Sequence, residues 1–432
     1  MNKLANLSVT RGFQIFQLFR FSALLLAGIL LSKSKVSIQE IGIYEGLIFI
    51  SGAVSFFWVN GILNGLLSQY KKEEKNKNVY FFNTGLLLVF MSILLILFMM
   101  VFSQTVQQFL PSTTPKIYGL MLIYIFLNNP TFLIEHIFLL NENTKGLLQY
   151  GALHTLAYVA AVIFPVWMDW ELEFVFYGLI LLSLVKNFYL WVLIYKENVF
   201  QINTKVIVDL LTFSTPLIFS FGLAGSAEYI DGLLVSSHFG SDQFAIFRYG
   251  ARELPLAVLL SSSLSASFIP RLNQNNLHPE LSNLKKESLN LMNLLFPITI
   301  LLVYLSTWIY PIIFRAEFIS SAPIFNTYLL LLVSRVLFPQ TLVLAAGKTK
   351  VILQIAIFEL IINFTCSYFL MLEYGIIGIA IGTLIAFYVE KLLLIFYVKR
   401  NLKINLTEYV PVSRWLMYSL ALYLVYFLTG NC

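Results

Sequence analysis

LTFSTPLIFSFGLAGSAEYIDGLLVSSHFGSDQFAIFRYGARELPLAVLLSSSLSASFIPRL, residues 211–272, consists of two long apolar runs joined by the short polar turn Ser236 to Gln243. Each run is longer than the ~20 residues that a helix needs to cross a bilayer. Charged residues in such runs are costly and usually have a partner or face a polar path. The two runs contain five of them, namely Glu228, Asp231, Arg248, Arg252 and Glu253. The stretch therefore predicts a membrane hairpin with charges at depth.

The acids and the arginines of this hairpin are predicted to lie level with each other. At about 1.5 Å per residue, counted from Gly240, Glu228 and Arg252 both lie roughly 18 Å from the turn. One interpretation is two interhelical ion pairs, Glu228 with Arg252 and Asp231 with Arg248. The other is that the arginines line a water-filled substrate path. A gated transporter is compatible with both.

The composition of the whole chain places it in the membrane. Of 432 residues, 59% are hydrophobic and 12% are charged, so the bilayer is expected to be the main solvent. The two cysteines, Cys366 and Cys432, give neither a disulfide framework nor a metal site. Arg11 and Arg20 interrupt the first apolar run, so no cleavable signal peptide is expected.

Apolar runs predict an all-α bundle of twelve spanning helices in two sets of six. The first set is expected near residues 10–31, 41–68, 79–103, 116–140, 146–168 and 173–195, and the second near 208–236, 244–270, 288–312, 322–345, 350–372 and 375–398. The run Trp415 to Leu428 is either a short thirteenth span or a helix at the interface.

Lysines and arginines favour one set of the predicted loops. With a cytoplasmic N-terminus, most basic loop residues are inside, and the outer set holds only Lys33, Lys35, Lys116 and Arg315. This bias predicts that the N-terminus is cytoplasmic. It also explains the net charge of +6 without a nucleic-acid partner.

The two sets of helices resemble two copies of one unit. Thr144–Gln149 matches Thr349–Gln354, and Glu40–Glu45 lies over Gln243–Arg248 at nearly the same offset. An even number of spans makes such copies parallel, with the substrate expected between them. We therefore expect an N-terminal six-helix lobe, a C-terminal six-helix lobe and a C-terminal extension with an extra helix, at residues 1–200, 201–400 and 401–432.

The repeat pairs Glu45 with the position of Arg248. The two side chains either form an outer gate across the lobes or find partners within their own lobes. Glu228 and Asp231 are expected to take part in gating or coupling, because they lie at the depth of the arginines.

Basic residues at depth predict an anionic cargo. Guanidinium groups bind a diphosphate with two parallel hydrogen bonds and stay charged when desolvated. Arg11 is expected to reach the headgroups. The expected substrate-binding residues are Arg20, Arg248, Arg252, Arg335 and Lys186.

Several of these segments resemble a known superfamily. The residues that carry the resemblance are Phe213-Ser214-Thr215-Pro216, Asp231, Gly240, Tyr249-Gly250-Ala251-Arg252, Leu254-Pro255, Pro270 and Glu373 to Thr383. They are similar to the multidrug/oligosaccharidyl-lipid/polysaccharide exporter superfamily, and within it to the Wzx-type polysaccharide flippases. The resemblance implies a two-lobed V-shaped (MATE-like) bundle in the bacterial cytoplasmic membrane. It also implies transport of a polyprenyl-diphosphate-linked oligosaccharide for O-antigen, lipopolysaccharide or capsule synthesis.

Two alternatives remain within this superfamily. A lipid II flippase is indicated by Arg252 and Arg20, which resemble arginines of that branch in helices 8 and 1. The shorter spacing from Arg252 to Pro255 and the lack of two extra C-terminal helices speak against it. A cation-coupled multidrug exporter would instead depend on its acids.

An enzyme is not expected. The predicted exterior loops are short, and the histidines His136, His154, His238 and His278 are scattered. We expect no cofactor and no metal site. The expected mechanism is alternating access by a monomer among membrane lipids, driven by a coupling cation, H⁺ or Na⁺, or by the membrane potential.

Overall fold

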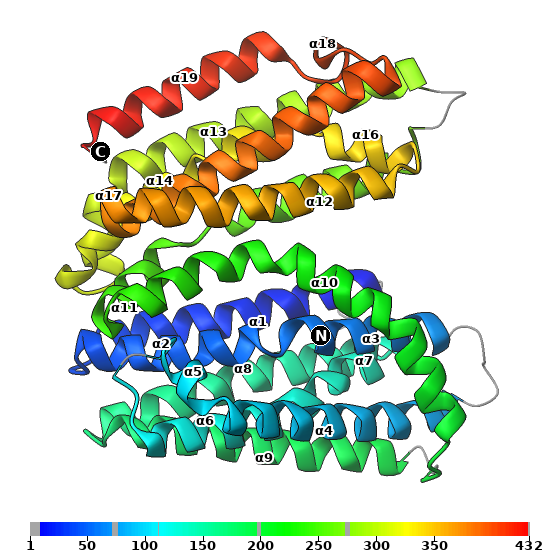
Figure 1. Ribbon diagram of the computed structural model, residues 1–432, viewed down its shortest axis with the longest axis vertical. Coiled ribbons are helices and arrows are strands. Elements are labelled where there is room, and N and C mark those ends of the chain that lie inside the picture. The colour runs from blue at the N-terminus through cyan, green and yellow to red at the C-terminus, as the bar shows by residue number, and fades with distance from the viewer. Residues whose placement is uncertain (1–8, 71–76, 111, 197–199, 273–276, 431–432) are drawn as a thin grey trace. The chain divides into compact units, whose positions relative to one another are not determined.

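The computed structural model describes residues 9–70, 77–110, 112–196, 200–272 and 277–430, and every regular element in these ranges is a helix (Figure 1). The prediction of an all-α membrane bundle is therefore confirmed. The chain divides into two compact units. Unit 1 comprises Met1–Gly225 and Phe239–Ala245, and unit 2 comprises Ser226–His238 and Ile246–Cys432.

Unit 1 is built on long helices that pack in pairs, α1 on α8 and α6 on α9, with α9 also against α8 (Figure 1). Its elements are α1 (Val9–Ser32), α2 (Ile38–Ala53), α3 (Phe56–Tyr70), α4 (Lys77–Val101), α5 (Ser103–Gln107), α6 (Pro115–Asn128), η3 (Asn129–Phe132), α7 (Leu133–Leu140), α8 (Thr144–Trp167) and α9 (Leu172–Lys196).

Side-chain caps define where several of these helices begin. Ser37 accepts a hydrogen bond from the backbone N–H of Glu40, and Glu40 accepts one from Ser37, which makes a capping box for α2. Thr114 caps α6, whose first residue is Pro115. Asn143 caps α8. These caps satisfy N–H groups that have no partner within the helix.

Two predicted spans of unit 1 are interrupted. The span expected at 41–68 is α2 followed by α3, bent by 44°. The span expected at 116–140 contains the 3₁₀ turn η3, where Pro130 removes a backbone donor. Asn129 Nδ2 donates to Ser55 Oγ at 3.0 Å, so a buried hydrogen bond joins the two interruptions.

Two helices contribute to both units: unit 2 holds the end of α10 (Thr204–His238) and the second half of α11 (Ser241–Gly250). Its other elements are α12 (Pro255–Phe268), α13 (Leu277–Ile313), η4 (Ala316–Ser320), α14 (Ser321–Leu329), α15 (Leu332–Arg335), α16 (Pro339–Ala345), α17 (Thr349–Tyr397), η5 (Val398–Leu402), α18 (Leu406–Tyr409) and α19 (Val412–Leu428).

The prediction of one continuous helix over 244–270 is wrong in its middle. Helix α11 ends at Gly250 and α12 begins at Pro255, with non-helical backbone between them. A proline is favoured at the first position of a helix and disfavours helical backbone in the residue before it. The span predicted at 322–345 is interrupted in the same way, because α16 begins at Pro339.

Helix α17 is two antiparallel arms. The chain turns at Gly375, whose φ of 60° lies in the left-handed region that favours glycine. A Cβ at Gly378 would lie 2.1 Å from Leu370 O, and one at Gly382 would lie 2.4 Å from Ser367 N. The two glycines therefore allow the backbones of the two arms to touch.

The number of helices that could span a membrane is close to, but below, the number expected from the sequence. Among the described residues, nine helices are long and apolar enough to cross a membrane, or ten if α2 and α3 form one span. The twelve spans expected stay a prediction, because this count reaches twelve only if the second arm of α17 and the pair α11 and α12 are each taken as a span. The run Trp415–Leu428 forms most of α19, which packs on α13.

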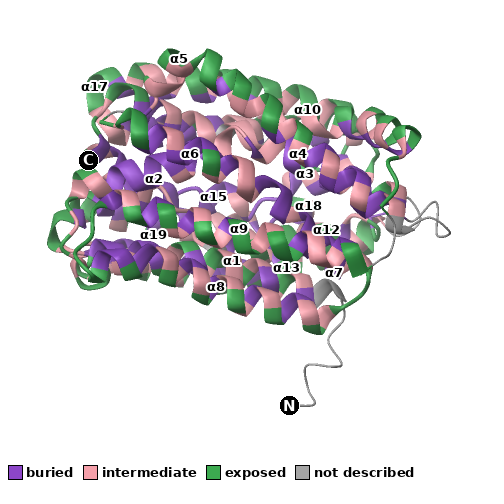
Figure 2. Cartoon of the chain, turned by 90° about the horizontal axis from the view of Figure 1, so that it is seen from below, coloured by how far each residue is buried: buried purple, intermediate pink, exposed green. Residues whose placement is uncertain are grey.

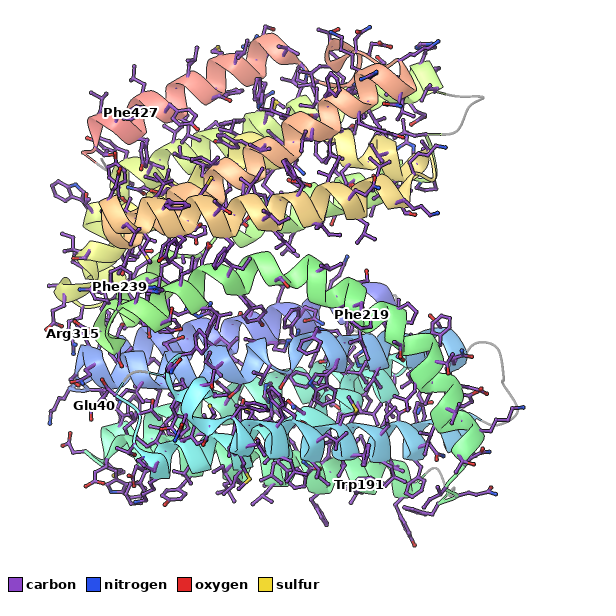
Figure 3. All side chains as sticks on the ribbon, viewed as in Figure 1. Glu40, Trp191, Phe219, Phe239, Arg315 and Phe427 are labelled. Carbon is purple, nitrogen blue, oxygen red and sulfur yellow. The ribbon has the colours of Figure 1, made fainter. Side chains whose placement is uncertain are left out.

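Exposed residues lie along the outer helices (Figure 2). Many of them carry large apolar side chains, as expected for helices that face lipid. They include Leu156 on α8, Phe188 on α9, Trp308 on α13 and Phe427 on α19, the last of which is marked in Figure 3. The chain is therefore a multi-pass membrane protein.

Candidate functional site

Arg20 is held within unit 1 by an acid that the sequence analysis did not single out. Its Nη1 atom lies 3.4 Å from Oε1 of Glu135 on α7, and its guanidinium lies 5.8 Å from the centre of the Phe132 ring. The Arg20 side chain is 39% exposed, whereas that of Glu135 is 7% exposed. Glu135 is a charged residue within an apolar run, and that feature of the sequence would have been enough to identify it.

Lys186 joins the same polar cluster. Its Nζ atom donates to Asn128 Oδ1 at 2.8 Å, just before the interruption at η3. It also interacts electrostatically with Glu135 and Arg20. Two basic side chains therefore share one acid here, which leaves the cluster net positive. Glu45 lies elsewhere in unit 1, buried on α2.

Arg252 lies in the non-helical stretch between α11 and α12. Its Nε atom donates to Arg248 O at 3.3 Å, and its guanidinium lies 5.4 Å from the centre of the Tyr249 ring. No carboxylate among the described side chains pairs with it. Arg248 itself lies half-buried on α11. Arg252 is thus a partly buried cation, and the N–H groups at the end of its guanidinium form no ion pair with a described carboxylate.

Arg335 is bound by Glu253, the residue after Arg252. Arg335 Nε donates to Glu253 Oε2 at 2.9 Å and Nη2 donates to Oε1 at 2.6 Å. The guanidinium also lies 5.0 Å from the centre of the Phe387 ring. This two-point pair joins the interruption at residues 251–254 to the end of α15.

Among the predicted acids whose side chains the structure describes, Asp231 is the more deeply buried, at 3% exposed. Its Oδ2 atom accepts hydrogen bonds from the hydroxyls of Tyr328 and Thr383, the latter at 2.5 Å. Its Oδ1 atom has no hydrogen-bond partner among the described residues. A buried carboxylate in this state is well oriented but not neutralised.

Asp231 stands at the end of a line of polar groups between the two arms of α17. Thr383 Oγ1 also contacts Ile379 O at 3.3 Å, and Ser367 Oγ donates to the same carbonyl at 3.1 Å. Ser367 in turn lies 3.2 Å from Asn363 Oδ1. Asn363 and Ser367 are fully buried. The line offers several oxygen atoms around one carboxylate.

The predicted ion pair between Asp231 and Arg248 is wrong, because Asp231 is held by hydroxyl groups instead. The pairing with Arg248 was inferred from matched depth alone, and depth does not determine which neighbour a side chain faces. The side chains of Glu228 and Arg11 lie outside the described part of the structure. The gate between Glu45 and Arg248 stays a prediction.

The comparisons with known proteins agree on one superfamily. The family model described as lipid II flippase MurJ matches residues 134–430, which is more than half of the chain. No curated protein matches the chain. The structure of a lipid II flippase MurJ in an inward closed conformation is similar with a TM-score of 0.66 and 18% identity, over 96% of this chain and 92% of that one.

Two drug-transporter structures share the fold. An inward-facing MATE family transporter of the MOP superfamily gives a TM-score of 0.60 at 12% identity, covering 94% of each chain. A mutant of the Vibrio cholerae MATE transporter VcmN gives 0.55 at 14% identity, covering 97% of this chain and 98% of that one. At these identities the likeness shows the fold, and the expectation of a MOP-superfamily transporter rather than an enzyme is confirmed by the family match.

Proposed function

Because the chain belongs to the lipid II flippase MurJ family, we propose that it moves lipid II, a lipid-linked precursor of peptidoglycan, across the bacterial cytoplasmic membrane. The family match runs from residue 134 to residue 430, so it covers nearly all of unit 2 and the latter part of unit 1. The residues that would meet the diphosphate of such a substrate come from the basic clusters of the two units.

The main functional expectation from the sequence, a Wzx-type flippase for O-antigen or capsule, is wrong. The matching family model is that of the lipid II flippases, which the sequence analysis treated as the weaker alternative. The argument from the missing C-terminal helices failed because the match extends through α19 to residue 430. The short spacing from Arg252 to Pro255 also fails as an argument, since Arg252 lies in non-helical backbone that ends at Pro255, and spacing along such backbone does not determine depth.

The observation that carries this proposal is the state of Arg252. Its guanidinium is held over the Tyr249 ring and is paired with no carboxylate among the described side chains. A guanidinium in this state keeps its charge and presents parallel donors to a phosphate. An arginine that is paired with a carboxylate, such as Arg335, would have to break that ion pair before it could bind a phosphate group.

The other basic residues support this role with a positive potential. We propose that Arg20 also contacts the diphosphate, because its side chain is the more exposed member of its pair with Glu135. Lys186, Arg248 and Arg335 add charge near these two contacts within their own units. Positive potential concentrates an anionic headgroup where it has to bind.

Coupling to a cation, H⁺ or Na⁺, is the second part of the proposal, and Asp231 is the residue proposed for it. The buried carboxylate has an unpartnered oxygen, and no basic side chain among the described residues pairs with it. A monovalent cation at Asp231 would remove an uncompensated buried charge. Its release and rebinding supply a driving force for alternating access.

The proposed orientation has the N-terminus in the cytoplasm. Its support is the excess of Lys and Arg in one set of loops, with only Lys33, Lys35, Lys116 and Arg315 in the other. Membrane lipids surround the exposed apolar helices, and a monomer is proposed as the working form.

The test is a bacterial strain in which this chain replaces the resident lipid II flippase. With the chain expressed, newly made lipid II is expected to become accessible to a reagent added outside the cytoplasmic membrane. On depletion it should accumulate in the inner leaflet. If lipid II distribution and growth do not respond to expression of the chain, the proposed function is wrong.

A further inference from the structure

The break in the span of residues 321–345 is held by side chains of three other helices. They donate hydrogen bonds to backbone carbonyls that lie three residues apart, namely those of Leu330, Val333 and Val336. Tyr388 on the second arm of α17 donates to the first at 2.9 Å, and Trp415 Nε1 on α19 donates to the second at 2.9 Å. Ser288 on α13 donates to the third at 3.2 Å. A break leaves backbone groups without helical partners, so these bonds satisfy carbonyls that lipid cannot.

Helix α19 turns hydrogen-bonding side chains towards this break. Besides the indole of Trp415, Tyr423 donates to the Tyr388 hydroxyl at 2.8 Å. The Tyr426 hydroxyl lies 2.9 Å from Thr327 Oγ1 in the last turn of α14. Large apolar side chains cover the exposed side of the same helix, namely Leu416, Leu420, Leu424 and Phe427. A helix that only anchored the chain in lipid would need no hydroxyl or indole donor on its inner side.

The segment held in this way carries Arg335. The bonded carbonyls of Val333 and Val336 lie on either side of it in the sequence. Its guanidinium lies 5.0 Å from the centre of the Phe387 ring, and Phe387 is the residue before Tyr388. The second arm of α17 therefore contacts the Arg335 side chain and, through Tyr388, also holds the backbone of the same segment. The hydrogen bond from α19 to Val333 adds a second constraint on that backbone.

Arg335 in turn engages the acid that follows Arg252 in the chain. Arg335 Nε and Nη2 donate to the two carboxylate oxygens of Glu253, at 2.9 and 2.6 Å. Arg252 and Glu253 are neighbours in non-helical backbone. If Arg335 moved away, the partly buried carboxylate would attract the guanidinium next to it in the chain, because a partly buried ion without a partner is costly. Arg252 would then be paired with an acid and less available to a phosphate.

We propose that Tyr388 and Trp415 are positioning residues for transport. Their hydrogen bonds hold the segment of Arg335 where Arg335 binds Glu253, and this ion pair keeps Arg252 available for the diphosphate. The two residues act through Arg335 and do not contact the substrate themselves. Helix α19 thereby influences substrate binding from outside the site. The proposal rests on the proposed function, because it assumes that Arg252 binds the diphosphate of lipid II.

The test measures KM and kcat for transport of lipid II by the full chain in proteoliposomes. Tyr388→Phe removes only the hydroxyl that bonds the Leu330 carbonyl, and Trp415→Phe removes the indole donor. Each variant should raise KM by roughly twofold to tenfold, the equivalent of one hydrogen bond, and leave kcat unchanged. A purely structural role would instead lower the amount of active protein, which reduces the apparent kcat and leaves KM as it is.

The control is Tyr418→Phe, which removes a hydroxyl from α19 that bonds Asn293 on α13 at 2.9 Å, away from the break. It should match the wild type in both constants. Adding Glu253→Gln to Tyr388→Phe removes the carboxylate that competes for Arg252, so KM should return towards the wild-type value. The proposal is overturned if Tyr388→Phe and Trp415→Phe keep the wild-type KM, or if Glu253→Gln leaves a raised KM unchanged.

A second measurement separates this proposal from the proposed function. If Tyr388 acts on the ion pair of Arg335 and Glu253, the thermal unfolding midpoint of Tyr388→Phe with Glu253→Gln should fall by less than the sum of the two single shifts. This measurement needs no substrate. Additive shifts in a chain that transports lipid II overturn the positioning role alone. Coupled shifts in a chain that moves no lipid II overturn the proposed cargo and leave the effect of Tyr388 on the ion pair in place.

Discussion

Arg335 and Glu253 form a two-point ion pair that joins two interrupted helices of unit 2, with N–O distances of 2.9 and 2.6 Å. Unit 1 has a neutral counterpart, the hydrogen bond of 3.0 Å from Asn129 to Ser55. In both units a polar contact links the break in one span to the break in another. Interrupted helices leave backbone groups without helical partners, so such contacts fix the geometry of the breaks.

Removal of one partner of the Arg335 pair should destabilise unit 2. Glu253→Gln leaves the guanidinium without its carboxylate, and because both side chains are partly exposed, we expect a cost of about 1–3 kcal/mol, below that of a fully buried pair. The measurement is the midpoint of thermal unfolding in detergent. A double-mutant cycle with Arg335→Gln isolates the pair, and a coupling energy of zero contradicts this interpretation.

Glu135 is predicted to tune how tightly Arg20 holds the substrate. In Glu135→Gln, Arg20 and Lys186 have no acid to share, so an anionic headgroup should bind more tightly without being moved faster. We expect a lower KM for lipid II together with a lower kcat in a reconstituted transport assay.

The matched control for that prediction is Glu173→Gln, which removes another ion-paired acid of unit 1, the partner of Lys116. It should leave both kinetic constants unchanged. A higher KM in Glu135→Gln would show that Glu135 helps to bind the substrate rather than competing with it.

The close contact between the arms of α17 should not tolerate a larger residue. In Gly382→Ala the new Cβ would lie 2.4 Å from Ser367 N, so the arms must separate, at a cost of about 1–3 kcal/mol. Gly119→Ala on α6 is the control, because a Cβ there meets nothing within 4 Å. Thermal unfolding of both variants checks this, and equal midpoints would contradict the packing described.

The membrane class and the approximate spans could be predicted because they depend on local runs of apolar residues. The interruptions of the helices were harder to predict, although each of them has a proline, namely Pro130, Pro255 or Pro339. A proline within an apolar run is compatible with a bend as well as with a break. Depth counted along an assumed straight helix therefore does not apply beyond Gly250, where Arg252 lies in non-helical backbone.

Partners across long distances in the chain could not be predicted. Tyr328 and Thr383 lie 97 and 152 residues from Asp231, and no spacing rule links them to it. Arg248 was chosen because it was the nearest opposite charge in the same hairpin. The charged residues themselves were visible, but their contacts depend on how several helices pack.

Transport by variants of Arg252 tests the central claim most directly. In the replacement strain, the exposure of lipid II outside the membrane is measured for Arg252→Ala and Arg252→Lys, with the exposed Arg414→Ala on α19 as the control. Loss of a charge-assisted contact of about 1.5–3 kcal/mol predicts a roughly tenfold to hundredfold slower rate for Arg252→Ala, a partial rate for Arg252→Lys and a normal rate for the control. A normal rate for Arg252→Ala, at equal protein levels in the membrane, would contradict the claim that this guanidinium binds the diphosphate.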